Sequence, residues 1–320
     1  MYFQDIPFLL NVRTLSQSFE VFLCDPEAIY LNKGSIAGNY KIAACLGCGS
    51  EGSVYLAVHR QTAQFWALKK IRPDRYGMGT GEDADEYELH MYRKLHHPSL
   101  PMIVEEIRTP EGNFLVMEYI RGRNLQKIMD KEKHLDVERV LEIGISLCRT
   151  LAYLHTRDEP ILHLDLKPAN VIIRPDGKVM LVDLGASRRC ADREQNRIRC
   201  GTPGFAAPEQ YDPSRKLTAA ADIYSLGAVL YYLISGVIFS DRCIKSKIPG
   251  CPDALGKVIR KALAAKPKDR YQSAREFEDA LTKVKKELGA EKKRIRLEGA
   301  ILLAILCVYL AFRTIVSVLP

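Results

Sequence analysis

Apolar and polar residues follow two different periodicities along the chain. Short runs of alternating or strand-forming residues, separated by glycine-bearing turns, predict β-strands at 54–58, 65–71 and 114–119. Apolar residues that recur with a helical period predict helices over 82–95, 137–155, 221–235, 254–264 and 273–288. A strand-rich part followed by a helical part predicts an α+β fold with two lobes around a cleft.

These patterns divide the chain into five segments. They are an N-terminal extension (1–39), a strand-rich N-lobe (40–121), a helical C-lobe (122–284), a basic linker (285–298) and an apolar segment (299–319). In the extension, no basic start leads into a long apolar core, so we expect no cleaved signal peptide.

The apolar segment is the strongest sign of a membrane in this sequence. Residues 299–312 are all apolar or small, Arg313 interrupts the run, and residues 314–319 complete it. The total is close to the roughly twenty residues that a helix needs to cross a bilayer. The basic residues at 292–296 predict that the preceding domain is cytoplasmic, with the segment as a single-pass C-terminal anchor in the cell membrane. The alternative is a hydrophobic helix that packs on the domain or on a partner.

Composition narrows the class of protein without naming a function. The chain has 320 residues, of which 47% are hydrophobic and 27% charged, as in ordinary globular proteins. The net charge is +8, but no nucleic-acid reading module accompanies the basic residues, so we expect no nucleic acid as partner. The nine cysteines show no zinc-ligand spacing and favour reduced thiols in a cytosolic domain.

Oxygen ligands gather in two motifs of the helical part. Asp165 and Asn170 lie five residues apart in HLDLKPAN (163–170), and Asp183 begins DLG (183–185) after the apolar run 179–182. Carboxylate and amide oxygens suit Mg²⁺, a hard cation that often shares its sites with phosphate. The two motifs therefore predict a magnesium–phosphate site.

A glycine-rich loop and a lysine in the strand-rich part suit the same ligand. Gly47, Gly49 and Gly52 let a backbone approach phosphate oxygens, and Val54 continues into a strand rather than a helix. Lys69 follows at the end of the next predicted strand. Taken singly, the glycines could form a hairpin turn and the lysine could be a solvated strand end.

Together the motifs resemble those of the eukaryotic-like (Hanks-type) serine/threonine protein kinases, in the membrane-anchored form known from bacteria. The resemblance covers about residues 40–281 and adds WALK (66–69), GTPGFAAPE (201–209), Asp222 and Arg270. It implies a bilobal protein-kinase-like fold and the transfer of the γ-phosphoryl group of ATP to Ser/Thr hydroxyls of protein substrates. The alternative is a catalytically weak pseudokinase scaffold that binds nucleotide at the membrane.

The resemblance also implies a role for each catalytic residue. Asp165 would accept the hydroxyl proton, Lys167 would contact the transferring phosphoryl group, and Asn170 and Asp183 would bind Mg²⁺ or Mn²⁺. Glu88 would hold Lys69 in place, with Glu86 as the alternative.

For ATP, the resemblance implies a larger set of residues. Leu46, Val54, Ala67 and Ile172 would sandwich adenine, Met117 would be the gatekeeper of a hinge at 117–120, and Asn124 would reach the ribose. The complete set is Leu46, Gly47, Gly49, Gly52, Val54, Ala67, Lys69, Glu88, Met117, Glu118, Tyr119 and Ile172.

The segment before the APE motif would hold the protein substrate. Thr202 beside Lys167 is the combination expected of a serine/threonine kinase. Glu209 would pair with Arg270, and Asp222 would brace the catalytic loop.

One position departs from the family pattern. Leu164 stands where many kinases have an arginine, and between Asp183 and Glu209 the only hydroxyl residues are Ser187 and Thr202. The arginine that usually binds an activation-loop phosphate is therefore missing, and the segment has no obvious residue that would be phosphorylated. We expect activity that does not depend on activation-loop phosphorylation.

Overall fold

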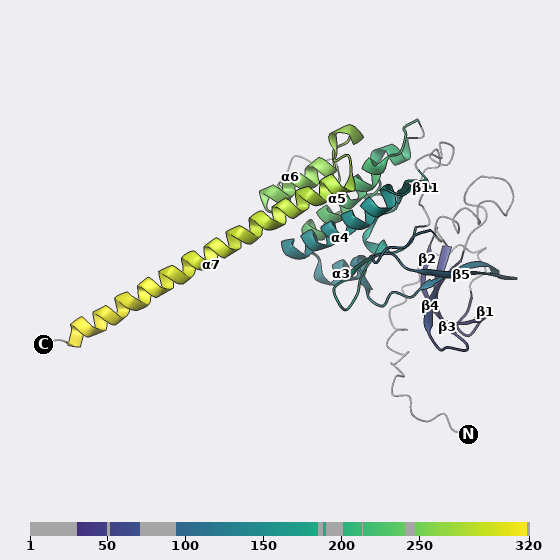
Figure 1. The fold of residues 1–320 in the computed structure, drawn as a ribbon, viewed down its shortest axis with the longest axis horizontal. Coiled ribbons are helices and arrows are strands. Elements are labelled where there is room, and N and C mark those ends of the chain that lie inside the picture. The colour runs from purple at the N-terminus through teal and green to yellow at the C-terminus, as the bar shows by residue number, and fades with distance from the viewer. Residues whose placement is uncertain are drawn as a thin grey trace, which may run out of the picture. The chain divides into compact units, whose positions relative to one another are not determined.

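The computed structural model describes residues 31–49, 52–70, 94–184, 188–189, 201–212, 214–240 and 247–318. The chain divides into two compact units (Figure 1). Unit 1 comprises Met1–Arg123 and Val171–Ala186, and unit 2 comprises Asn124–Asn170 and Ser187–Pro320. Unit 1 is rich in strands and unit 2 in helices, so the predicted α+β class is confirmed.

A twisted antiparallel sheet forms the body of unit 1. Its described strands are β1 (Ile36–Ala37), β2 (Tyr40–Gly49), β3 (Gly52–His59), β4 (Phe65–Lys70), β5 (Ile103–Thr109) and β6 (Gly112–Glu118). Their order across the sheet is β1-β2-β3-β4-β6-β5. Each of the three strands predicted from the sequence is present within one or two residues of its expected bounds.

The alternation of side chains gives this sheet two distinct faces. Tyr55 and Ala57 of β3, Leu68 of β4 and Phe114 and Val116 of β6 are fully buried in one hydrophobic cluster. Because successive strand residues point to opposite faces, the residues between them lie on the other side of the sheet. That second face carries the chemistry described below.

A short hairpin from later in the chain completes unit 1. Strands β9 (Val171–Ile173) and β10 (Val179–Leu181) pair in antiparallel register, and Leu181 N donates to Ser99 O at 2.8 Å. The buried strand expected at 179–182 is thus found, and it brings Asp183 into the unit that contains Lys69. Strand β7 (Arg123–Asn124) lies at the point in the chain where unit 1 gives way to unit 2.

The helices described in unit 2 are α3 (Leu125–Glu132), α4 (Val137–His155), α5 (Ala219–Ser235), α6 (Asp253–Ala262) and α7 (Ala274–Val318). Short elements connect them: β8 (Ile161–Leu162) pairs with β11 (Arg188–Arg189), and one-turn helices are η2 (Pro168–Asn170), η4 (Pro208–Tyr211) and η6 (Pro267–Asp269). Helix α4 has the predicted bounds because Asp136 caps it, accepting a hydrogen bond from Arg139 N at 3.0 Å.

Helix α5 is the core of unit 2. Almost all its residues are buried, including Asp222 near its start. Gly227 lets helix α6 approach closely, since a Cβ at that position would lie 2.9 Å from the Cβ of Ala262. Helices α5 and α6 are therefore packed closely against each other.

Helix α7 changes the expected organisation of the C-terminal region. It begins at Ala274, as predicted, but continues to Val318, so residues 285–298 are helical rather than a separate linker. Lysine, glutamate, arginine and leucine dominate that stretch and are good helix formers. Lys285 and Lys292 also form ion pairs with Glu142 and Glu138 of α4, at 2.8 and 3.0 Å.

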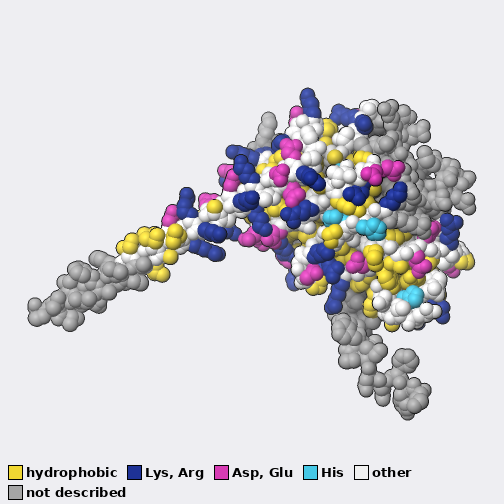
Figure 2. Space-filling view, viewed as in Figure 1, with side chains coloured by type: hydrophobic (Ala, Val, Ile, Leu, Met, Phe, Trp, Pro, Cys, Tyr) yellow, Lys and Arg dark blue, Asp and Glu magenta, His cyan; other side chains and the backbone are white. Residues whose placement is uncertain are grey.

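Beyond these ion pairs α7 displays apolar side chains. Figure 2 shows them gathered along the helix, next to a stretch with lysines and arginines. The exposed residues are Ile295, Leu297, Ile301, Leu302, Leu303, Ile305 and Leu306. Across the described residues, none of the helices combines the length and the apolar character needed to cross a membrane. The side chains from 307 onward, which belong to the predicted span, lie outside the described residues.

Two other expectations fall mainly outside the described residues. They concern the extension at 1–39, of which 1–30 are not described, and the helix at 82–95, of which only 94 and 95 are described and neither is helical.

Candidate functional site

The second face of the unit 1 sheet brings together several of the predicted nucleotide-binding residues. Val54 lies opposite Lys69 across β3 and β4, and Ala67 lies opposite Met117 across β4 and β6. All four occupy the strand positions that alternate with the buried cluster, so they share one face of the sheet. These four residues combine apolar side chains with a cation, which suits a heterocyclic ring joined to phosphates.

The glycines of the glycine-rich loop lie at the adjoining ends of β2 and β3. Gly47 has open space where a side chain would project, because a Cβ there would meet no atom within 4 Å. Gly52 has a φ of +118°, and a Cβ there would lie 2.7 Å from Lys70 O. Gly52 is therefore required by the backbone itself, whereas Gly47 keeps its surroundings open. Gly49 ends β2, opposite Gly52.

Lys69 and Asp183 form the charged centre of unit 1. Lys69 Nζ lies 3.0 Å from Asp183 Oδ1, and the lysine side chain is almost completely buried. Glu88 and the alternative Glu86, predicted to hold Lys69, lie outside the described residues. Asp183 has a φ of +68°, a conformation that costs free energy for a non-glycine residue. A buried cation paired with a carboxylate in an unfavourable backbone conformation is typical of a functional site.

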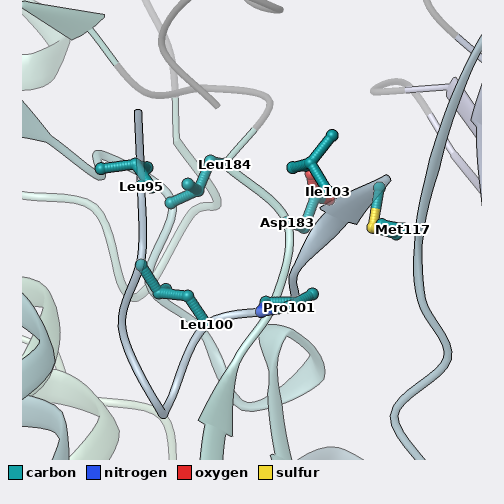
Figure 3. A pocket seen from close by; sticks show the side chains of 7 residues that line it. All are labelled: Leu95, Leu100, Pro101, Ile103, Met117, Asp183 and Leu184. Atoms are coloured by element: carbon teal, nitrogen blue, oxygen red, sulfur yellow. The ribbon is translucent and has the colours of Figure 1, made fainter. Parts of the chain in front are cut away.

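Leu184 follows Asp183 and packs into an apolar pocket (Figure 3). The pocket has a volume of about 10 Å³, which is room for no more than one water molecule. It is lined by Leu95, Leu100, Pro101, Ile103, Met117, Asp183 and Leu184. Leu184 is thus held beside Asp183 by apolar packing.

The remaining predicted nucleotide residues of unit 1 are placed as follows. Leu46 is exposed in β2, and Ile172 is half-buried opposite Met180. The Glu118 side chain lies 3.7 Å from Arg174, and the ring of Tyr119 lies near that of Phe65.

Asn124, expected to reach the ribose, has a structural role in unit 2. Its Oδ1 accepts a hydrogen bond from Lys127 N at 2.8 Å and so caps helix α3. Asparagine is a preferred cap in front of a helix, and the contact with the ribose stays a prediction.

In unit 2, Asp165 lies at the centre of a compact hydrogen-bonded cluster. Thr202 Oγ1 donates to Asp165 Oδ1 at 2.7 Å, and Lys167 Nζ lies 2.7 Å from Asp165 Oδ2. Lys167 Nζ also donates to Thr202 Oγ1 at 3.0 Å. The structure thus brings together a buried carboxylate, a cation and a hydroxyl from segments 35 or more residues apart.

Asn170 joins this cluster in a defined orientation. Its Nδ2 donates to Asp165 O at 3.0 Å and to Asp165 Oδ2 at 3.2 Å. Because the amide nitrogen faces Asp165, the amide oxygen Oδ1 is directed elsewhere and can bind a cation. The donor set therefore fits a hard metal ion on the Asn170 side.

Asp222 holds the backbone just before Asp165. Its two carboxylate oxygens accept hydrogen bonds from His163 N and Leu164 N, both at 2.8 Å, and His155 Nε2 lies 2.8 Å from Oδ2. Burial alone would raise the pKa of Asp222, but the hydrogen bond and charge of His155, with help from His163, lower it. The carboxylate is therefore ionised and fixes the backbone at Leu164, whose φ is +62°.

Glu209 and Arg270 form a buried ion pair. Arg270 Nη1 and Nη2 donate to the two Glu209 carboxylate oxygens at 2.6 and 2.8 Å. Arg270 also donates to Ala220 O in α5 at 2.8 Å. This bidentate pair attaches η4, and with it the Thr202 segment, to the core helix.

The sequence did not point to two further residues near Asp165. One is His155, the partner of Asp222, and the other is Gln210, whose Nε2 donates to Leu164 O at 2.7 Å. Gln210 follows the APE motif directly, which was the only available signal. Asp165, Lys167 and Asn170 belong to unit 2, and Lys69 and Asp183 to unit 1.

Comparisons with known proteins agree on one family. The family model "Protein kinase domain" matches residues 40–298. The chain is 31% identical over 246 residues to serine/threonine-protein kinase ppk16 of Schizosaccharomyces pombe, covering 73% of this chain and 34% of that protein. It is 29% identical over 278 residues to serine/threonine-protein kinase PknB of Mycobacterium tuberculosis, covering 78% of this chain and 43% of that protein.

Among solved structures, the PknI kinase domain of M. tuberculosis matches with a TM-score of 0.61 and 26% identity. The match covers 79% of this chain and 99% of that domain. The chain spans about a third to a half of the length of the curated relatives it matches.

Proposed function

The chain belongs to the protein kinase family, and from that premise we propose that it is an ATP-dependent serine/threonine protein kinase. Its substrates would be Ser/Thr hydroxyls of proteins. Support comes from the names of its relatives, serine/threonine-protein kinases, and above all from the cluster around Asp165.

The observation that carries the proposal is the contact of Asp165 with both Lys167 and Thr202. A degenerate site would be expected to lose at least one of these groups, yet the carboxylate, the cation and the hydroxyl lie within 3.0 Å of one another. Phosphoryl transfer requires positioning and charge neutralisation more than covalent participation of the protein.

Each residue has a defined task in the proposed reaction. Asp165 orients the acceptor hydroxyl and takes its proton as the new bond from oxygen to the γ-phosphorus forms. The bond between that phosphorus and the β,γ-bridging oxygen breaks, and ADP leaves with the electron pair. Lys167 neutralises charge on the transferring group, and Lys69 binds the phosphates that remain with ADP.

The face of the unit 1 sheet that carries Lys69 would bind ATP, with Val54, Ala67 and Met117 against adenine. A bound Mg²⁺ or Mn²⁺ ion would neutralise phosphate charge and orient the phosphates. Asp183 and the oxygen of Asn170 are the ligands that this chain would offer to the ion.

A transfer assay with Mg-ATP and mixed Ser/Thr peptides tests the proposal. The wild type should phosphorylate peptide, and Asp165→Asn, which keeps the shape of the side chain but removes the base, should not. Nucleotide binding without any Asp165-dependent transfer would instead favour the alternative function, a pseudokinase scaffold.

We further propose that activity does not require a phosphate on the activation segment. Leu164 is uncharged and completely buried, so it cannot bind a phosphate. The idea would be lost if Ser187→Val combined with Thr202→Val abolished activity and a phosphomimetic residue at 187 restored it. Thr202→Val alone is not diagnostic, because Thr202 contacts Asp165 directly.

We also propose that the C-terminal part of α7 attaches the protein to the cell membrane, with the kinase domain on the cytoplasmic side. The apolar residues 301–303, 305 and 306 are all exposed and point around the helix in several directions, which suits lipid better than one protein partner. Fractionation of cells that carry the chain with and without residues 297–320 tests this. The full chain should sediment with membranes and the truncated chain should not.

A further inference from the structure

The backbone of Leu164, the residue before Asp165, is held by side chains at both its N–H and its C=O group. Leu164 N donates to Asp222 Oδ1 at 2.8 Å, and Leu164 O accepts from Gln210 Nε2 at 2.7 Å. Leu164 is completely buried and has a φ of +62°. A leucine in this conformation is unfavourable unless its surroundings stabilise it, and these two hydrogen bonds are the stabilising contacts.

Gln210 uses both ends of its amide. While Nε2 donates to Leu164 O, Oε1 accepts a hydrogen bond from Ala207 N at 2.9 Å. The side chain is 3% exposed, so water does not compete for these bonds. We call this pair of hydrogen bonds the Gln210 bridge. It joins the backbone of the catalytic loop, at Leu164, to the backbone of the segment 201–210, at Ala207. We call this segment, which contains Thr202, the substrate-side segment.

Gly201 lies against the Gln210 bridge and leaves no room there for a side chain of its own. A Cβ at Gly201 would lie 2.7 Å from Gln210 Nε2 and 3.1 Å from Leu164 O. Its φ of +112° also requires glycine. The next residue, Thr202, donates to Asp165, so the bridge lies beside the hydroxyl that contacts the proposed base.

The bridge also closes a ring of hydrogen bonds within unit 2. Asp222 of α5 holds Leu164, Leu164 is joined to Gln210, the neighbouring Glu209 pairs with Arg270, and Arg270 donates to Ala220 O of α5. The ring begins and ends on the same helix. None of its members needs a phosphate.

From these contacts we infer that Gln210 is a positioning residue for phosphoryl transfer. It fixes the position of Asp165 relative to the segment that contains Thr202. In a kinase with an arginine at position 164, the pairing of that arginine with a phosphate could do this instead. This assignment rests on the proposed kinase activity and deepens it, because it names what replaces the missing arginine at 164.

The test measures kcat and KM for peptide and KM for ATP in the full chain. Gln210→Met keeps the size of the side chain and removes the bridge. We expect peptide kcat to fall about tenfold, or ~1.4 kcal/mol in activation free energy, while KM for ATP changes less than about twofold. Thr150→Val is the matched control, because it removes one hydrogen bond from a completely buried side chain to Ser146 O within α4. The control should keep wild-type kcat.

Gln210→Glu gives a signature that a purely structural role would not produce. The carboxylate can still accept from Ala207 N but cannot donate to Leu164 O. Burial raises the pKa of such a carboxyl, so it becomes neutral as the pH is lowered from about 8 to about 6. The neutral carboxyl can donate to Leu164 O, and the activity of the variant relative to wild type should therefore rise over this range.

Each outcome decides one claim. A Gln210→Met protein that is folded and matches wild type overturns the assignment. If that protein loses its folded-state circular dichroism, Gln210→Glu decides instead, and a pH-independent activity ratio overturns the assignment. A wild type without Asp165-dependent transfer would remove the proposed function itself.

Discussion

The two units carry their chemistry in different ways. In unit 1 the charged centre is the pair of Lys69 and Asp183, and the sheet also carries apolar side chains and Gly47, next to which there is open space. In unit 2 the carboxylate of Asp165 accepts hydrogen bonds from three side chains, and the backbone before it is fixed by Asp222 and Gln210.

This difference separates binding from chemistry. A face that receives a charged ligand needs open space and charges that can change partner when the ligand binds. A base that must take a proton from a positioned hydroxyl needs a fixed location, since small displacements reduce the rate strongly. The variants below break one region while leaving the other intact.

The largest effect is expected for the base in unit 2. Asp165→Asn should lower peptide kcat by about 10²–10⁴-fold, because general base catalysis is lost. ATP affinity, which we assign to unit 1, should change little. Steady-state kinetics measures the fall in kcat, and calorimetry measures the affinity for ATP. A parallel loss of ATP binding would contradict the assignment of ATP binding to unit 1 and of the base to unit 2.

Arg270→Met breaks the attachment of η4 to α5. It leaves the Glu209 carboxylate buried without its partner, which typically costs about 3–5 kcal/mol. Urea unfolding should show this loss in the free energy of unfolding, and Arg260→Met, which changes an arginine on α6, should not. Similar unfolding curves for the two variants would mean that the buried pair does not hold the segment.

The corresponding variant in unit 1 is Lys69→Met. Removal of the cation should reduce kcat/KM for ATP by about 10²-fold, the usual consequence of losing one donor to a reacting phosphate or oxyanion. Since the Asp183 carboxylate that is left without Lys69 is partly exposed, whereas Glu209 is completely buried, the free energy of unfolding should fall less than in Arg270→Met. Unchanged kcat/KM for ATP would contradict the assignment of the phosphates to this face.

Acid should weaken unit 2 through Asp222. Although burial alone would raise it, the hydrogen bond and charge of His155 hold the folded pKa of Asp222 below its ordinary value of 3.8. The stability that Asp222 contributes is therefore present above that value and is lost as the pH falls through the lower folded pKa. Asp222→Asn should cost about 1–3 kcal/mol at neutral pH, because only one of the two backbone N–H groups keeps an acceptor. The difference from wild type should shrink in acid, and a constant difference would contradict the ionised state.

The smallest effect is expected on the surface between α4 and α7. Lys285→Gln and Lys292→Gln each remove one exposed ion pair, which should cost less than about 1 kcal/mol. Thermal unfolding at low and high salt checks this, because wild type and variants should converge at high salt.

The sequence was most informative where local patterns decide the structure. The alternation in 54–58 and 114–119 and the cap at Asp136 were enough to predict strands β3 and β6 and helix α4. The pairing of Glu209 with Arg270 was expected from the family resemblance, and the structure contains it.

Contacts that depend on tertiary approach were not visible in the sequence. Gln210 reaches Leu164 from 46 residues away, and nothing in its neighbourhood indicates that partner. The capping role of Asn124 was not foreseen, and it depends on where helix α3 begins. The continuous helix through 285–298 was missed because a run of basic residues was taken as a linker, although the same residues favour helix.

The most direct test of the account is the activity of the dephosphorylated protein. Wild type treated with phosphatase, and shown by mass spectrometry to carry no phosphate, is mixed with Mg-ATP and peptide, and transfer is followed from the first seconds. The account predicts transfer to Ser/Thr at full rate without a lag, with none in Asp165→Asn. A lag that ends as the activation segment becomes phosphorylated, or no transfer at all, would contradict it.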